Sequence, residues 1–115
     1  FDYEDVDRKT KEFFAQRRKA TAVIVFCDIL AISGMKAIID VGVSIAQDIS
    51  IVGFDNIKIG SLLPISLTTI DPNKKKMIET ASELLLEAIR LDNIKVSNLS
   101  IEPTLTIRSS TTPPV

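Results

Sequence analysis

The chain has 115 residues, of which 45% are hydrophobic and 25% charged, a composition typical of one ordinary globular domain. Its 14 basic and 15 acidic residues give a net charge of −1, which excludes the strong positive field that holds a DNA backbone. With no histidine and a single cysteine, Cys27, the sequence also excludes an internal disulfide and histidine-based metal or hydrolytic sites, so we expect no metal and no cofactor.

The chain begins with a predicted surface helix and a predicted buried strand. Apolar residues recur at helical spacing among charged residues between Asp5 and Arg18, which predicts an amphipathic helix. Residues 22–26 then form a continuous apolar run, typical of a strand buried on both faces of a parallel sheet. Even extended by Cys27, this run is far shorter than the roughly 20 residues that span a bilayer, so we expect no membrane partner.

A helix and a second strand are predicted next. Asp28 follows the first strand and is expected to cap a helix over residues 29–41, with Gly42 as its stop signal. Residues 49–54 form another apolar run that indicates a buried strand. The order strand, helix, strand predicts a right-handed βαβ unit in a parallel sheet.

The last third of the chain predicts a strand and a long helix. Residues 67–70 are a short strand candidate, and Asp71 and Pro72 are expected to open a helix that extends to Leu91. This helix has a wide apolar face, formed by Met77, Ile78, Ala81, Leu84, Leu85, Ala88 and Ile89. We expect this face to be covered, either by a second copy of the chain or by folding back onto the sheet, unless the helix is mobile.

After the helix, the sequence predicts an edge strand and a loose end. Apolar and polar residues alternate over residues 99–107, with an interruption at Pro103, which indicates an edge strand or two short strands meeting there. Residues 109–115 are expected to form a frayed tail.

Two carboxylates are predicted where parallel strands end, which is where ligands bind in open α/β sheets. Asp28 follows the first strand and Asp55 follows the second. Ionised carboxylates accept two hydrogens at once, so a pair at one sheet edge suits a sugar or other polyol. Helix capping is the competing role for Asp28, and a turn is the competing role for Asp55.

Other reactive residue types favour no catalytic site. Cys27 lies at the same sheet edge, but it has no histidine or second cysteine to activate it, and a buried inert thiol is expected. The lysine run 74–76 is interpreted as a solvated helix face rather than a phosphate site.

Four segments carry a family resemblance. They are residues 21–31, 48–56, 68–70 and 102–111, in this order and spacing. From about Phe1 to Thr111, the chain resembles the C-terminal part of lactose-repressor and galactose-repressor type transcription regulators.

The resemblance implies an α/β fold in which helices flank a parallel sheet, as in the C-terminal lobe of a type I periplasmic-binding-protein-like fold. Residues 1–71 would form this lobe, and residues 72–100 a crossover segment whose helix packs on the first lobe. Residues 101–115 would supply the return strand and tail. The DNA-binding head, the hinge helix and the complete first lobe would lie outside these 115 residues.

The resemblance also implies an effector site. Phe1 matches the aromatic residue that stacks on the effector, and Asp55 matches the acid that binds its polar edge. Asp28 matches the acidic member of an Asn-Asp pair, while Cys27 stands where a ligand-binding asparagine is usual. Pro72 replaces a frequent glutamine, which changes the usual pattern of sugar contacts.

Finally, the resemblance implies a homodimer through Ile32, Leu62 and Leu63, although core packing is an equally good explanation for Ile32. The expected function is the effector-sensing and dimerising portion of a cytoplasmic transcription regulator. Its partners would be a sugar-like effector, a second copy, and operator DNA through the head that lies outside the chain. The alternative is a lobe of an exported sugar-binding protein of a transport system, and an enzyme ranks third.

Overall fold

Four short strands form one sheet in the order β1-β2-β3-β4 in the computed structural model, which describes residues 2–16, 20–91 and 98–113. The strands β1 to β3 run parallel and β4 runs antiparallel to β3. Their bounds are β1 Ala22–Ile24, β2 Ser50–Phe54, β3 Thr68–Asp71 and β4 Thr104–Thr106. The sheet is therefore parallel over β1 to β3, as the sequence predicts, and its last strand is an antiparallel edge strand.

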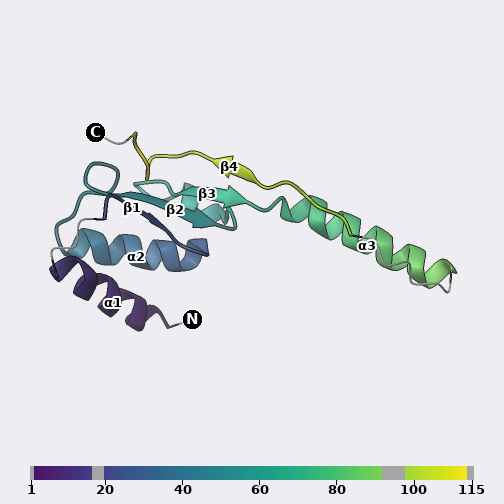
Figure 1. Cartoon of the computed structure of the whole chain (residues 1–115), viewed down its shortest axis with the longest axis horizontal. Helices are drawn as coiled ribbons and strands as arrows, with labels where there is room; N and C mark the ends of the chain where they lie inside the picture. Colours follow the sequence, from purple (N-terminus) through teal and green to yellow (C-terminus); the bar gives the residue numbers. More distant parts are fainter. Residues whose placement is uncertain (1, 17–19, 92–97, 114–115) are drawn as a thin grey trace.

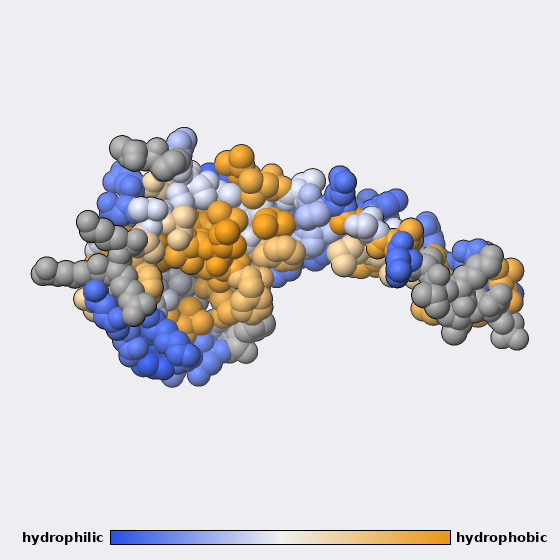
Figure 2. Space-filling model, in the orientation of Figure 1, coloured by the Kyte–Doolittle hydropathy of each residue, from blue (hydrophilic) through white to orange (hydrophobic). Residues whose placement is uncertain are grey.

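Two helices cover one face of this sheet. Helix α2 (Asp28–Asp40) connects β1 to β2 and packs on the sheet, which confirms the predicted βαβ unit. Helix α1 (Tyr3–Ala15) lies against α2 on the same side, and its outer surface is hydrophilic (Figures 1 and 2). A short 3-10 turn, η1 (Lys58–Ser61), follows β2.

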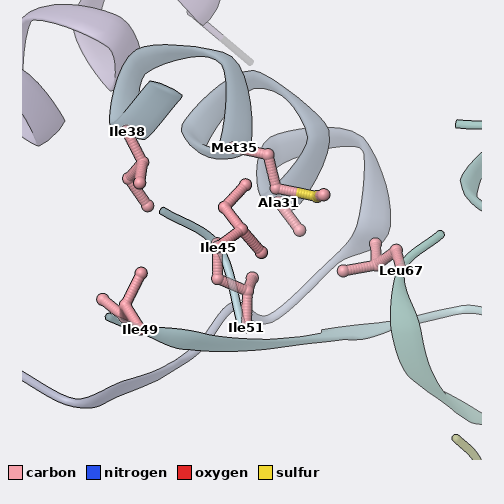
Figure 3. Close-up of a cluster of buried hydrophobic side chains, with 7 residues drawn as sticks. All are labelled: Ala31, Met35, Ile38, Ile45, Ile49, Ile51 and Leu67. Atoms are coloured by element: carbon pink, nitrogen blue, oxygen red, sulfur yellow. The ribbon is translucent and has the colours of Figure 1, made fainter. Parts of the chain in front are cut away.

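The hydrophobic core lies between α2 and the sheet (Figure 3). Helix α2 contributes residues one turn apart, and β2 contributes the side chains that alternate toward the helix. Each large aliphatic side chain buried here contributes about 1.5–3 kcal/mol. The core residues are Ala31, Met35, Ile38, Ile45, Ile49, Ile51 and Leu67.

Strand β1 corrects the prediction of a strand buried on both faces. It is the outer strand of the sheet, and Ile24 is 79% exposed while Val23 packs against the core. An uninterrupted apolar run shows that both faces suit burial, but it does not show how many faces the fold covers. Here α1 and α2 lie on only one side of β1.

The ends of the first two helices differ slightly from the prediction. Helix α1 begins at Tyr3, because Asp2 caps it by accepting hydrogen bonds from the backbone N–H groups of Glu4 and Asp5, both 3.1 Å long. Helix α2 ends at Asp40, and Gly42 follows with a φ of +79°, as its predicted role as a stop signal requires.

Helix α3 (Lys74–Leu91) begins later than expected, so the prediction that Asp71 and Pro72 open it is wrong. Asp71 still belongs to β3, where it pairs with Thr104, and its Oδ1 accepts from the backbone N–H of Asn73 at 2.7 Å. Asn73 has a φ of +60°, which turns the chain from the strand into the helix.

Helix α3 projects away from the sheet (Figure 1). No residue of the helix is buried, and hydrophobic side chains show at the surface along it (Figure 2). The radius of gyration is 18.4 Å, whereas about 13 Å is typical of a compact chain of this length. The expectation that the helix folds back onto the sheet is therefore wrong.

The segment after β4 is not a frayed tail. Ser110 is fully buried, and its Oγ donates to the carbonyl of Ile51 at 2.6 Å and accepts from the N–H of Thr68 at 2.8 Å. Its own carbonyl accepts from the N–H of Ile51 at 2.8 Å. These bonds hold β2 and β3 together at their amino ends, so the prediction of fraying fails for residues 109–112.

Candidate functional site

The carboxyl ends of β1, β2 and β3 bring three pairs of residues to one edge of the sheet. Residues 27–28 follow β1, residues 55–56 follow β2, and residues 71–72 end β3. The parallel pairing of these strands places all three ends on the same side, as ligand sites in such sheets require.

Asp28 is the buried anchor of this edge, with 0% of its surface exposed. Its Oδ1 accepts a 2.6 Å hydrogen bond from Thr69 Oγ1, and its Oδ2 accepts a 2.8 Å bond from the N–H of Ile57. The N-cap of α2 is Cys27, so the prediction that Asp28 caps the helix is wrong. The Asp28 carboxylate instead ties α2 to β3 and to the turn after β2.

Asp55, which follows β2, differs from Asp28 in its backbone conformation and in the surroundings of its carboxylate. Its φ of +111° lies in a region that non-glycine residues rarely adopt, and such conformations persist where surrounding structure holds them. Its backbone N–H donates to the carbonyl of Ile70 at 2.9 Å. Within the described part of the chain, its half-buried carboxylate has no hydrogen-bond partner and remains free to accept from a ligand.

Asn56 and Arg108 complete the edge, and the sequence analysis did not identify either of them. Asn56 Nδ2 donates to Asp71 Oδ2 at 2.9 Å, and Asn56 Oδ1 accepts from Arg108 Nη2 at 2.6 Å. The bond from Asn56, the N–H of Asn73 and the nearby Lys74 together hold the pKa of Asp71 below its ordinary value. The only sequence signal for these residues is their position within the segments that carry the family resemblance.

The structure shows no ligand-binding feature at the other predicted effector residues that it describes, Cys27 and Pro72. Cys27 is buried at the start of α2, and its side chain makes no capping hydrogen bond. Pro72 is half-buried beside the end of β3. Phe1 lies outside the described residues, so its predicted stacking role stays a prediction.

The three predicted dimer residues lie near one apolar groove on the side of the lobe. Ile32 and Leu63 are half-buried and pack against the core, whereas Leu62 is 71% exposed. The groove has a volume of about 260 Å³. Its lining consists of Ile32, Met35, Lys36, Ile39, Asp40, Leu63, Pro64 and Ile65.

The described residues, 2–16, 20–91 and 98–113, contain no cluster of three or more potential metal ligands. They also contain no helix with the length and apolar character needed to cross a membrane.

The sheet, its covering helices and the polar edge define the chain as an α/β unit of the periplasmic-binding-protein-like fold. The chain belongs to the family of periplasmic binding protein-like domains, whose model matches residues 2–111.

Several transcription regulators are similar to this chain. The HTH-type transcriptional regulator MalR of Clostridium butyricum is 41% identical over 90 residues, which cover 78% of this chain and 26% of that protein. The structure of a LacI family transcriptional regulator from Enterococcus faecium with bound ribose matches with a TM-score of 0.87 and 28% identity. That match covers 100% of this chain and 42% of the other.

The structure of the lac repressor dimer bound to operator and the anti-inducer ONPF also matches, with a TM-score of 0.82 and 26% identity. The match covers 92% of this chain and 37% of the repressor. The chain therefore spans about a quarter of the curated relative and less than half of each solved chain.

Proposed function

We propose that this chain is the effector-sensing and dimerising portion of a DNA-binding transcription regulator. It contributes one side of a cleft that takes a sugar or a similar small polar molecule. The observation that carries the proposal is the half-buried Asp55 carboxylate, which has no partner among the described residues and stands at the carboxyl end of a parallel strand.

The chemistry of this edge suits hydroxyl groups. The Asp55 carboxylate accepts charge-assisted hydrogen bonds from ligand hydroxyls, worth about 1.5–3 kcal/mol each in a site shielded from water. Asp28 holds the turn after β2 in place through its hydrogen bond from the N–H of Ile57. Phe1 would stack on the ligand ring. Cys27 offers only a weak donor, so this chain makes fewer polar contacts to its ligand than an asparagine would allow.

The proposed role is binding rather than catalysis. The relatives compared above are transcription regulators, which favours this role over an exported transport protein or an enzyme. The net charge of −1 supports contact with operator DNA only through a segment outside these 115 residues. A cytoplasmic location follows from the same role.

A homodimer through the groove described above forms part of the proposal. Leu62 is an exposed aliphatic residue next in the chain to Leu63, which lines the groove with Ile32, and exposed aliphatic patches suit pairing with an identical surface. The lac repressor structure that matches this chain is a dimer.

The test is a titration of the isotope-labelled chain with ribose and with a panel of other pentoses and hexoses, followed by amide resonances. We expect the largest shifts at Asp55 and Asn56, and we expect Asp55→Ala to lose them. Glu87→Ala removes an exposed carboxylate of helix α3, away from this edge, and serves as the matched control. Shifts that are absent, or that survive Asp55→Ala unchanged, would refute the proposed site.

A further inference from the structure

A guanidinium group from the far end of the chain reaches the turn that carries Asp55. Arg108 follows β4, and its Nη2 donates to Asn56 Oδ1 at 2.6 Å, across 52 positions of sequence. Its Nη1 donates to the carbonyl of Leu67 at 2.8 Å. One planar group therefore joins the turn after β2 to the start of β3.

Asn56, the residue after Asp55, is held from several sides. Its side chain lies between Arg108 and Asp71, with hydrogen bonds of 2.6 and 2.9 Å. Its backbone N–H donates to Thr69 Oγ1 at 3.2 Å. Asn56 itself has a φ of +48°, so two consecutive non-glycine residues, Asp55 and Asn56, adopt positive φ angles.

Asp55 is strained, because residues other than glycine rarely adopt a φ of +111°. Asn56, at +48°, lies in the left-handed region that asparagine tolerates. Local sequence does not relieve the strain at Asp55, because that position is not a glycine. The stabilisation has to come from contacts made by distant parts of the chain. Among the described residues, Asn56 has three hydrogen-bond partners, Thr69, Asp71 and Arg108. Of these, only Arg108 follows α3 in the chain.

We propose that Arg108 is a positioning residue for the effector site. By clamping Asn56, it holds the adjoining Asp55 in the backbone conformation that leaves its carboxylate without a protein partner. The backbone N–H of Arg108 also donates to Thr68 Oγ1 of β3 at 2.9 Å. A shift of the segment that follows β4 relative to β3 would therefore move the Arg108 guanidinium away from Asn56. The site and the return segment are thus mechanically coupled.

The chemistry of arginine is essential to this role. The guanidinium presents several donors in one plane and satisfies Asn56 and Leu67 at the same time. A lysine keeps the charge but donates from one point, so it can reach only one of the two acceptors in this geometry. Arg108→Lys should therefore restore part, and not all, of what Arg108→Gln loses.

The first test needs no ligand. The three-bond coupling between the amide and α protons of Asp55 reports φ, and we expect Arg108→Gln to shift it toward the value of an ordinary negative φ. Amide exchange at Asp55, whose N–H donates to Ile70, should become about tenfold faster as the strained turn opens. Arg90→Gln changes an exposed arginine of α3 and is the matched control. An unchanged coupling in both Arg108 variants overturns the proposal.

The second test uses ribose as the probe and rests on the proposed function. Arg108→Gln should weaken ribose binding by about tenfold, and it should have no further effect in an Asp55→Ala background, because it acts through that carboxylate. Additive losses in the double variant would show that Arg108 acts independently and would overturn the proposal. If the unaltered chain does not bind ribose, the proposed function fails at this probe, while the coupling measurement still decides the positioning role. Where Arg108→Gln does not fold, Arg108→Lys replaces it in both tests.

Discussion

The carboxylate of Asp28 lies directly against the backbone of Gly53. A β-carbon on Gly53 would stand 2.1 Å from Asp28 Oδ1 and 2.9 Å from Leu67 Cδ2. The start of α2 therefore approaches β2 more closely than any side chain on that position of the strand would allow. This contact places the buried acid within reach of Thr69 and Ile57.

The first prediction concerns this contact. Gly53→Ala should destabilise the fold by about 3 kcal/mol, because the new methyl group overlaps the anchor carboxylate and a core leucine. Urea unfolding measures the change. Gly34→Ala is the matched control, since nothing lies within 4 Å of a β-carbon at that helical position. Equal effects of the two substitutions would contradict the close approach.

The second prediction concerns the anchor itself. Asp28→Ala should cost about 3–5 kcal/mol, because the Thr69 hydroxyl and the Ile57 N–H lose their buried acceptor. Asp28→Asn keeps one acceptor oxygen and should cost less. Thermal unfolding of both variants provides the measurement, and a small loss in Asp28→Ala would show that the two donors find other partners.

A third prediction follows from the backbone of Asp55. Asp55→Gly should raise the free energy of unfolding by about 1 kcal/mol, since glycine adopts a φ of +111° without strain. The same substitution should remove ligand binding. A stabilised chain that no longer binds would show that strain at this position serves the site, whereas a destabilised one would show that the carboxylate has a structural partner.

The fourth prediction is a pH dependence at Asp71. The hydrogen bond from Asn56 is the largest cause that lowers the pKa of this carboxyl below its ordinary value of 3.8. The bond therefore stabilises the folded state fully at pH values well above 3.8, and this contribution is lost as the pH falls below 3.8 through the folded pKa. In a carboxyl titration followed by NMR, Asn56→Ala should move the midpoint up toward 3.8. A midpoint unaffected by Asn56→Ala would argue against the bond.

The fifth prediction is that helix α3 contributes little to the free energy of unfolding. Leu85 is 62% exposed and no α3 residue is buried, so Leu85→Glu should change the free energy of unfolding by less than about 0.5 kcal/mol. Ile51→Ala, in the core, should cost about 2–5 kcal/mol.

Association is measured on the same proteins. The sequence leaves two outcomes open for the apolar face of α3, which are cover by a second copy and a mobile helix, and both stay predictions. Sedimentation of the unaltered chain, Leu85→Glu and Leu62→Glu distinguishes the two candidate surfaces. Loss of the dimer only in Leu62→Glu would assign it to the groove beside α2, and loss only in Leu85→Glu would assign it to α3.

Sequence predicts those parts of the fold that depend on residues close together in the chain. The βαβ unit follows from two apolar runs and the helix between them, and Gly42 marks the end of that helix through its own backbone freedom.

The parts that sequence misses depend on contacts between distant segments. Ser110 looks like a polar tail residue, and only its bonds to Ile51 and Thr68 make it a buried one. Asp28 and Asp55 are both acids after strands, yet the close approach of Gly53 buries the first while the turn geometry frees the second. The position after a parallel strand suggests the same ligand-binding role for both acids, although their competing roles differ.

The pairing of Asp71 with Thr104 has a consequence for the architecture. Strands β3 and β4 are antiparallel neighbours, so the chain leaves the sheet and returns to it at one point, and residues 72–103 form an excursion from what is topologically a β-hairpin. Closing a loop costs about 0.6 kcal/mol for each doubling of its length. An Asn-Gly turn in place of the excursion would close the hairpin directly and leave a smaller unit that keeps Asp28, Asp55, Asn56 and Asp71 at the sheet edge, without Pro72, and the groove beside α2.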